Sequence, residues 1–143
     1  MQGETGSLRY AASGHVRLRA SVTALSDGAL DLVVDLAIDD GWHVNSSQPL
    51  QAELLALEVA VVEELGWRLE DLSFPEPAEI TLGFQDEALS VYQGDVRVQG
   101  RLVKEQASSP WAASVELRVQ ACNDELCLRP ETLRLQVSVP GAL

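Results

Sequence analysis

The chain has 143 residues, which corresponds to one domain at the usual size of about 150 residues. Hydrophobic residues make up 46% of it, enough to build a core without metals or cross-links. Its 22 acidic and 10 basic side chains give a formal net charge of −12, which disfavours binding to nucleic acid or anionic lipid. No apolar run approaches the roughly 18 residues of a membrane-spanning helix, because Glu58 interrupts the best one, residues 54–62.

The N-terminus carries no secretory signal, because Met1-Gln2-Gly3-Glu4-Thr5-Gly6 lacks a basic region and an apolar region. We therefore expect either a cytosolic protein or a mature segment without its leader. Composition leaves this choice open.

Apolar and polar residues alternate with a period of two in four segments, residues 15–22, 30–38, 115–121 and 133–139. This period is typical of strands with one face on a core and one in water. Weaker patterns predict further strands at residues 57–63, 67–69 and 95–103, and a helical turn at residues 51–57.

About seven or eight short strands, separated by glycine- and proline-containing turns, predict an all-β fold with little helix. We expect an immunoglobulin-like β-sandwich of antiparallel strands over residues 8–143, preceded by a disordered segment at residues 1–7. An antibody-type sandwich joins its sheets through cysteines far apart in sequence. Here Cys122 and Cys127 are only five positions apart, so the pair acts locally, between the last two predicted strands.

The position of the pair also follows from the strand pattern. Alternation over residues 115–121 places Cys122 on the face of Gln120, opposite the core-facing Ala121. We therefore expect the cysteines near a sandwich edge, where a partner can reach them.

Three uses of the cysteine pair stay open at this point. A structural disulfide closing about 6 residues contributes roughly 2 kcal/mol, against almost 5 for a loop of about 100 residues. A closed zinc site needs four ligands, and His15 and His43 supply the number, but the C-x4-C spacing is wider than usual. The third use is a redox-active pair that cycles between dithiol and disulfide.

The charges around the cysteines bear on the redox use. Asp124 and Glu125 lie between the two sulfurs, and negative neighbours raise the pKa of a thiol. We therefore expect a slow nucleophile that reacts with a bound, oriented partner.

Other polar and aromatic residues have structural explanations. Asp31, Asp35 and Asp39 alternate along one strand and are expected to form a solvated face rather than a calcium site. The tryptophans are expected to anchor the core or an interface: Trp42, Trp67 and Trp111.

Three segments carry a resemblance to a known family. Residues 119–130 read Val-Gln-Ala-Cys-Asn-Asp-Glu-Leu-Cys-Leu-Arg-Pro, and residues 41–50 read Gly-Trp-His-Val-Asn-Ser-Ser-Gln-Pro-Leu. The third comprises Phe-Pro-Glu-Pro at residues 74–77 and Val-Tyr-Gln-Gly at residues 91–94. Together they resemble the N-terminal periplasmic domains of the thiol:disulfide interchange protein family DsbD, over roughly residues 8 to 140.

The resemblance implies a thiol:disulfide oxidoreductase domain of the bacterial periplasm, within a larger membrane protein. It implies that a thioredoxin-like domain reduces the pair, which passes electrons to disulfide isomerases or cytochrome c maturation thioredoxins. By the family pattern Cys127 attacks and Cys122 resolves the mixed disulfide, with no cofactor beyond the cysteines. The spacing of the cysteines differs from the best-known member, with four intervening residues instead of five.

The family also has a cap loop whose aromatic residue shields the cysteines, with carboxylates close by. Residues 82–89 occupy that place, which implies Phe84 as the cap and Asp86 and Glu87 as acidic neighbours. Here the aromatic precedes the acids, and the Asp-Glu-Phe-Tyr run of the well-known version is missing. Tyr92 is a further candidate to line the site.

The leading hypothesis is thus a redox relay domain. The alternative is a non-catalytic immunoglobulin-like interaction module whose short disulfide only shapes a loop.

Overall fold

The computed structural model describes residues 7–62, 66–81 and 87–138, and these residues form strands joined by turns. The elements follow in chain order: β1 (Ser7–Ala11), the 3-10 turn η1 (Ala12–Gly14), β2 (Val16–Ala24), β3 (Leu30–Ile38), β4 (His43–Asn45), β5 (Glu58–Val61), β6 (Trp67–Ser73), β7 (Ala78–Thr81), β8 (Ala88–Tyr92), β9 (Asp95–Lys104), β10 (Ala112–Val119), β11 (Ala121–Cys122) and β12 (Glu131–Ser138).

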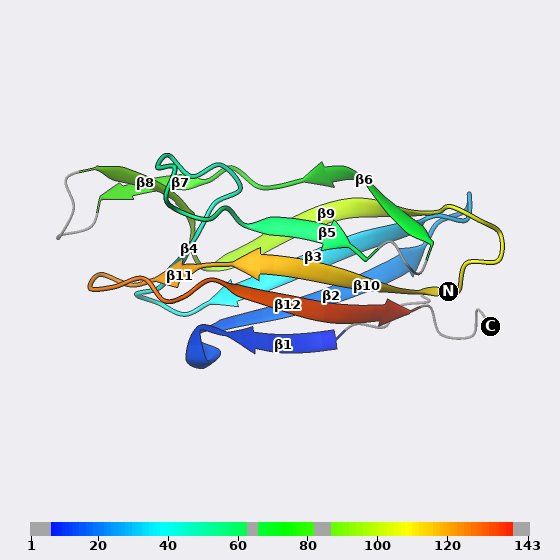
Figure 1. Ribbon diagram of the computed structural model, residues 1–143, viewed down its shortest axis with the longest axis horizontal. Helices are drawn as coiled ribbons and strands as arrows, with labels where there is room; N and C mark the ends of the chain where they lie inside the picture. The colour runs from blue at the N-terminus through cyan, green and yellow to red at the C-terminus, as the bar shows by residue number, and fades with distance from the viewer. Residues whose placement is uncertain (1–6, 63–65, 82–86, 139–143) are drawn as a thin grey trace.

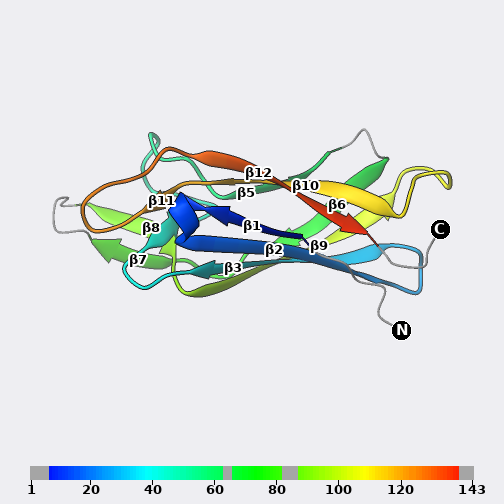
Figure 2. The same cartoon turned by 90° about the horizontal axis from the view of Figure 1, so that it is seen from below.

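The strands form three antiparallel sheets. A five-stranded sheet, β1-β2-β3-β9-β6, faces a three-stranded sheet, β12-β10-β5, and the two layers are seen edge-on in Figure 2. A four-stranded sheet, β11-β4-β8-β7, lies at one end of the sandwich (Figure 1). We call this third sheet the end sheet.

The alternation in the sequence places the core between the two larger sheets. In β3 every second residue is buried, while Asp31 and Asp35 point outward. Apolar side chains from both layers meet inside and are fully buried: Leu18, Leu32, Leu36, Leu117 and Leu135. Trp67 belongs to this core, and its indole N–H donates to the carbonyl of Pro110 at 2.8 Å.

The predicted all-β antiparallel architecture is confirmed. The segment predicted at 30–38 coincides with β3, and the other predicted strands correspond to β2, β5, β6, β9, β10 and β12. The helical turn predicted at 51–57 is wrong. Those residues form one hydrogen-bonded turn, from the N–H of Leu54 to the carbonyl of Gln51 at 3.2 Å, followed by chain without helix.

Five short strands were not predicted: β1, β4, β7, β8 and β11. None exceeds five residues, so the alternation in each is too brief to separate it from a loop. The strand β1 begins at Ser7, the last residue of the segment predicted as disordered, and pairs Ser7 with Ala20.

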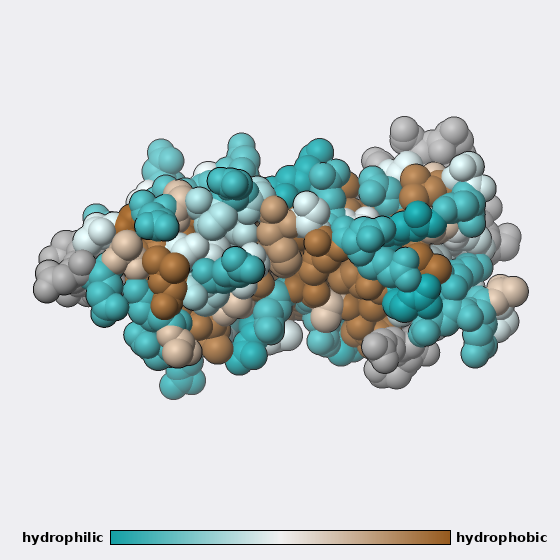
Figure 3. Space-filling view, turned by 90° about the horizontal axis from the view of Figure 1, so that it is seen from above, coloured by the Kyte–Doolittle hydropathy of each residue, from teal (hydrophilic) through white to brown (hydrophobic). Residues whose placement is uncertain are grey.

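A change of sheet positions the cysteines. After β10 the chain leaves the three-stranded sheet at Gln120 and joins the end sheet as its edge strand β11. There Ala121 pairs with Val44, and Cys122 with His43. The outside of the molecule is mixed, with hydrophilic residues over much of the face in Figure 3 and smaller hydrophobic clusters among them.

Candidate functional site

The two cysteines form a disulfide at the end of the molecule that carries the end sheet. Cys122 ends β11, Cys127 follows the loop, and their Cα atoms are 4.0 Å apart. The two residues also form an antiparallel bridge, so the loop between β11 and β12 is a closed hairpin tip (Figure 1). In this state both sulfurs are bonded to each other and neither is a free thiolate.

The two sulfur-bearing residues differ sharply in burial. Cys122 is 1% exposed, whereas Cys127 is an exposed residue. Ala121 and Cys122 are both buried, at 4% and 1% exposed, so the predicted alternation between a core-facing Ala121 and an outward-facing Cys122 does not appear in their burial. A reagent or partner approaching from solvent therefore meets Cys127 first.

The loop between the cysteines holds its shape through its own hydrogen bonds. The side-chain oxygen of Asn123 accepts the N–H groups of Glu125 and Leu126 at 2.8 and 3.0 Å. The N–H of Asn123 donates to the carbonyl of Leu126 at 2.9 Å, and the N–H of Leu128 to that of Ala121 at 2.9 Å. None of these hydrogen bonds involves a sulfur atom, so reduction of the disulfide removes none of them directly.

An amide pair, Asn45 and Gln120, connects β4 to the chain next to the disulfide. The side-chain N–H of Asn45 donates to the side-chain oxygen of Gln120 at 2.9 Å and to the carbonyl of Leu55 at 3.0 Å. The side chain of Gln120 in turn donates to the carbonyl of Leu128, directly after Cys127, at 3.3 Å. The pair thus connects β4 to the segments on both sides of the disulfide.

His43 lies across the β4–β11 ladder from Cys122 and is 2% exposed. Its Nε2 atom is buried and has no hydrogen-bond partner among the described residues. Burial lowers the pKa of this imidazole below its ordinary 6.5, and the nearby charge of Asp124 opposes the shift. The sequence interpretation considered His43 only as a metal ligand, and no sequence signal reported its pairing with Cys122.

The acidic residues of the loop are exposed, and Asp124 and Glu125 both reach solvent. The expected rise in the thiol pKa caused by these carboxylates stays a prediction.

The predicted cap residues fall largely outside the described part of the chain. Phe84 and Asp86 lie within residues 82–86, which the structure does not describe. Glu87 is exposed and directly precedes β8. Tyr92 is 3% exposed, packs with the main core and pairs with Val44, the neighbour of His43 on the other face of β4. Its place beside the disulfide stays a prediction.

The residues considered as zinc ligands do not form one cluster in the fold: Cys122, Cys127, His15 and His43. His15 stacks on Trp42 at 4.5 Å between ring centroids and contacts Asp39 at 3.2 Å, whereas His43 is buried beside Cys122. Within residues 7–62, 66–81 and 87–138, no group of three or more ligating side chains has the arrangement of a metal site. The aspartate face of β3 instead makes ion pairs, from Asp35 to Arg97 and from Asp39 to Arg17.

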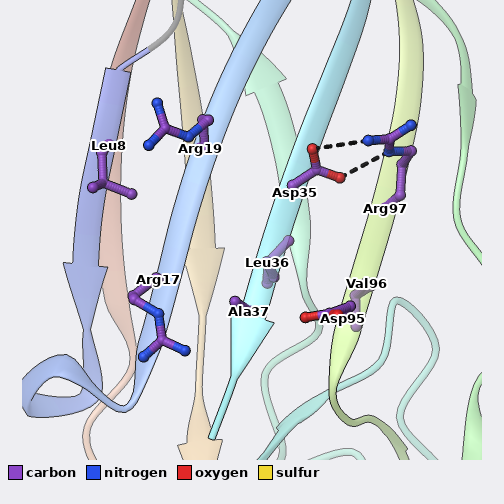
Figure 4. A pocket seen from close by; sticks show the side chains of 9 residues that line it. All are labelled: Leu8, Arg17, Arg19, Asp35, Leu36, Ala37, Asp95, Val96 and Arg97. Carbon is purple, nitrogen blue, oxygen red and sulfur yellow. Dashed lines mark hydrogen bonds and ion pairs between the residues drawn. The ribbon is translucent and has the colours of Figure 1, made fainter.

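A groove of about 540 Å³ lies away from the cysteines, across β1, β2, β3 and β9 (Figure 4). Three arginines line it, but two have acidic partners: Arg97 binds Asp35 at 2.8 Å, and Arg17 binds Asp39 at 2.9 Å. These ion pairs neutralise most of the positive charge, so the groove offers no strong anion site.

The fold and the disulfide define a class: an antiparallel β-sandwich that carries a local cysteine pair at one end. Residues 15–138 match the family described as "Thiol:disulfide interchange protein DsbD, N-terminal". The chain therefore belongs to this family, which confirms the resemblance. Membership, together with the bonded cysteine pair, supports a function in thiol–disulfide exchange.

Solved structures agree with the fold. The N-terminal periplasmic domain of ScsB from Proteus mirabilis superimposes with a TM-score of 0.70 at 17% identity, over 99% of this chain and 55% of that one. This chain thus spans just over half of that structure. The reduced N-terminal domain of DsbD from Neisseria meningitidis gives a TM-score of 0.54 at 19% identity, over 77% and 78% of the two chains.

The likeness to the DsbD domain confirms the immunoglobulin-like fold. The fold alone does not specify the chemistry, since the GAE domain of Saccharomyces cerevisiae GGA2p reaches a TM-score of 0.54 at 11% identity, over 91% of this chain and 95% of that one. No curated protein sequence matches the chain. Among the residues that the structure describes, no helix is long and apolar enough to cross a membrane.

Proposed function

We propose that this domain relays electrons in the bacterial periplasm, as a thiol:disulfide oxidoreductase that uses the Cys122–Cys127 pair. The observation that carries the proposal is the difference in burial between the two residues. Exchange through a mixed disulfide needs one sulfur that a partner can reach and a second, protected sulfur nearby that completes the reaction. Cys127 is exposed and Cys122 is buried, and the disulfide between them shows that their sulfurs are within bonding distance.

In the delivering direction the reduced domain gives two electrons to a partner disulfide. The thiolate of Cys127 attacks one partner sulfur, which forms a mixed disulfide and releases the other partner sulfur as a thiolate. The thiolate of Cys122 then attacks the sulfur of Cys127, which closes the domain disulfide and releases the partner as a dithiol. Two protons accompany the two electrons, and in the proposed exchange the sulfur atoms of the two cysteines carry the electrons themselves.

In the loading direction the steps run in reverse. A thiolate of a reduced thioredoxin-fold donor attacks the sulfur of Cys127, and Cys122 leaves as a thiolate. The second donor thiolate then closes the donor disulfide and releases Cys127 as a thiolate, and both domain thiolates take protons from solvent. We propose that the donor is a domain of the same membrane protein and that the acceptors are periplasmic thioredoxin-fold proteins. Family membership supports this arrangement.

Trapping tests the roles. In Cys122→Ser the remaining Cys127 is exposed and cannot be resolved, so it should accumulate a mixed disulfide with a thioredoxin-fold protein whose own resolving cysteine is removed. In the matched variant Cys127→Ser the remaining thiol is buried, and trapping should be weak. Equal trapping by both variants, or by neither, would contradict the assignment.

A non-catalytic interaction module with a structural disulfide is the alternative. The hydrogen bonds of Asn123 already shape the loop, so the disulfide adds little there as a staple. A structural bond of this kind has a reduction potential below about −300 mV and does not equilibrate with thioredoxin-like partners. A relay pair equilibrates with them.

A further inference from the structure

His43 and Cys122 face each other directly across the β4–β11 ladder. Antiparallel partners in register point their side chains to the same face, with Cβ atoms roughly 4.5 to 5.5 Å apart. Side chains at this separation are close enough to interact across the ladder. Both residues are also buried, at 2% and 1% exposed, so they have little contact with solvent.

The hydrogen-bonding state of His43 points to a partner that is missing in the disulfide form. Its Nε2 atom is buried without a partner among the described residues, and buried polar atoms are rarely left in that condition. A disulfide sulfur has no proton to donate. Once the bond is reduced, Cys122 carries an S–H group that can donate to Nε2.

We propose that His43 is the proton acceptor for Cys122 in the step that resolves the mixed disulfide. This inference rests on the proposed function and assigns His43 a part in it. Neutral His43 takes the proton from the Cys122 thiol, the resulting thiolate attacks the sulfur of Cys127, and the new S–S bond expels the partner thiolate. The expelled thiolate is then protonated from solvent and His43 returns its proton to water, so atoms and electrons balance.

The surroundings of His43 suit this task. Burial favours the neutral imidazole near pH 7, which is the form that accepts a proton. The charge of Asp124 favours the imidazolium once it forms. On the other side of β4, the ionisable residue of β8 is Tyr92, which pairs with Val44 and so lies on the opposite face. Among the described residues, Asp124 is the charged group that affects the pKa of His43.

The resolving step can be isolated with 5,5′-dithiobis(2-nitrobenzoic acid) and the reduced 143-residue chain. The exposed Cys127 reacts first and releases one coloured thionitrobenzoate, and Cys122 then displaces the second. The rate of the second release reports the proposed proton transfer, and mass spectrometry verifies that the product is the Cys122–Cys127 disulfide. Cys122→Ser should release only the first.

In His43→Gln the first release should keep its rate, while the second should slow by about 100-fold at neutral pH, the lower range of general base catalysis. The pH profile should change as well. In the unsubstituted chain, the rate of the second thionitrobenzoate release should be constant at pH values above the lowered pKa of His43. It should fall at pH values below that pKa, where the imidazole is protonated. In the variant it should rise about tenfold per pH unit across the neutral range, because the attacking thiolate then forms without an internal base.

Two further variants separate this role from a structural one. His15→Gln alters the other histidine, which contacts Asp39 on the outer face, and should leave both releases unchanged. His43→Ala should be partly rescued by added imidazole, which a purely structural role does not predict. An unaltered second rate and pH profile in His43→Gln would overturn the inference while leaving the relay intact. A first release that persists at its full rate in Cys127→Ser would instead overturn the proposed roles of the cysteines.

Discussion

The sandwich core and the end sheet are built on different principles. The core between the two larger sheets is apolar, with leucine, valine and Trp67 fully buried. The end sheet and the residue after β4 contribute most of the buried polar residues in the described part of the chain: His43, Asn45, Ser46 and Ser90. Ser46 and Ser90 bond to each other at 2.7 Å, and Asn45 bonds to Gln120.

This difference in buried groups separates the part of the molecule that stabilises the fold from the part that carries the cysteines. Burying polar groups gains little free energy even when they are hydrogen-bonded, whereas apolar burial is the main stabilising contribution to folding. The end sheet gives up part of that contribution and places one of its buried polar residues, His43, across from Cys122 of the disulfide. Such an arrangement suits an exchange site better than a structural cross-link. Changes in the core should therefore alter stability alone, and changes around the cysteines should alter exchange.

The largest effect on stability should come from the core. Leu117→Ala removes a side chain that is 0% exposed and should lower the free energy of unfolding by about 3 kcal/mol, because it leaves a cavity. Urea denaturation of the oxidised domain measures the change. The rates of thionitrobenzoate release from the reduced domain should stay the same. A large change in those rates would show that core and site are coupled.

Reduction of the disulfide should have a smaller effect. Closing a loop of about 6 residues stabilises the folded state by roughly 2 kcal/mol, and none of the backbone hydrogen bonds of the loop involves a sulfur atom. Urea unfolding with and without a reducing agent should therefore differ by about 2 kcal/mol or less, with a cooperative transition in both cases. Loss of that transition on reduction would favour a structural disulfide.

A change in the loop should affect exchange more than stability. Asn123→Ala removes the acceptor of two N–H groups, so the reduced loop should open and hold the two sulfurs less closely. The equilibrium between dithiol and disulfide in a glutathione buffer should move toward the dithiol by about fivefold, which corresponds to about 1 kcal/mol. Leu126→Ala, an uncharged substitution at an exposed position of the same loop, is the control and should leave the equilibrium unchanged.

The smallest effect should come from the outer face of the sandwich. Hydrogen bonds from Arg17 and His15 lower the pKa of Asp39 below its ordinary 3.8. The stabilisation by this carboxylate is present above pH 3.8 and is lost as the pH falls through the lower pKa of the folded state. Asp39→Asn should therefore destabilise the domain slightly at neutral pH, with no difference in strong acid. Urea midpoints across that range test this, and exchange rates should not change.

The same division explains what the sequence could predict. The long strands repeat their alternation over eight or more residues, so residues 30–38 were predicted with the bounds of β3. The end sheet consists of strands of two to five residues, whose pairing depends on contacts between distant segments. Residues 41–50 and 119–130 both resembled the family, but nothing local indicated that His43 and Cys122 are cross-strand neighbours.

The burial of Cys122 is a further feature that alternation did not predict. Alternation predicted opposite faces for Ala121 and Cys122, but both are buried in β11, which pairs with β4 after the change of sheet at Gln120. The pairing of the cysteines is local, and the structure shows it as a disulfide. The burial that distinguishes Cys122 from Cys127 depends on the three-dimensional fold.

The equilibrium reduction potential of the Cys122–Cys127 pair tests the central claim most directly. The oxidised domain would be mixed with a reduced thioredoxin-fold protein of known potential, and the four redox species quantified after acid quenching and alkylation. An exchangeable pair should equilibrate with that protein, with a potential above about −300 mV. A disulfide that stays oxidised throughout, with a potential below that value, would contradict the account.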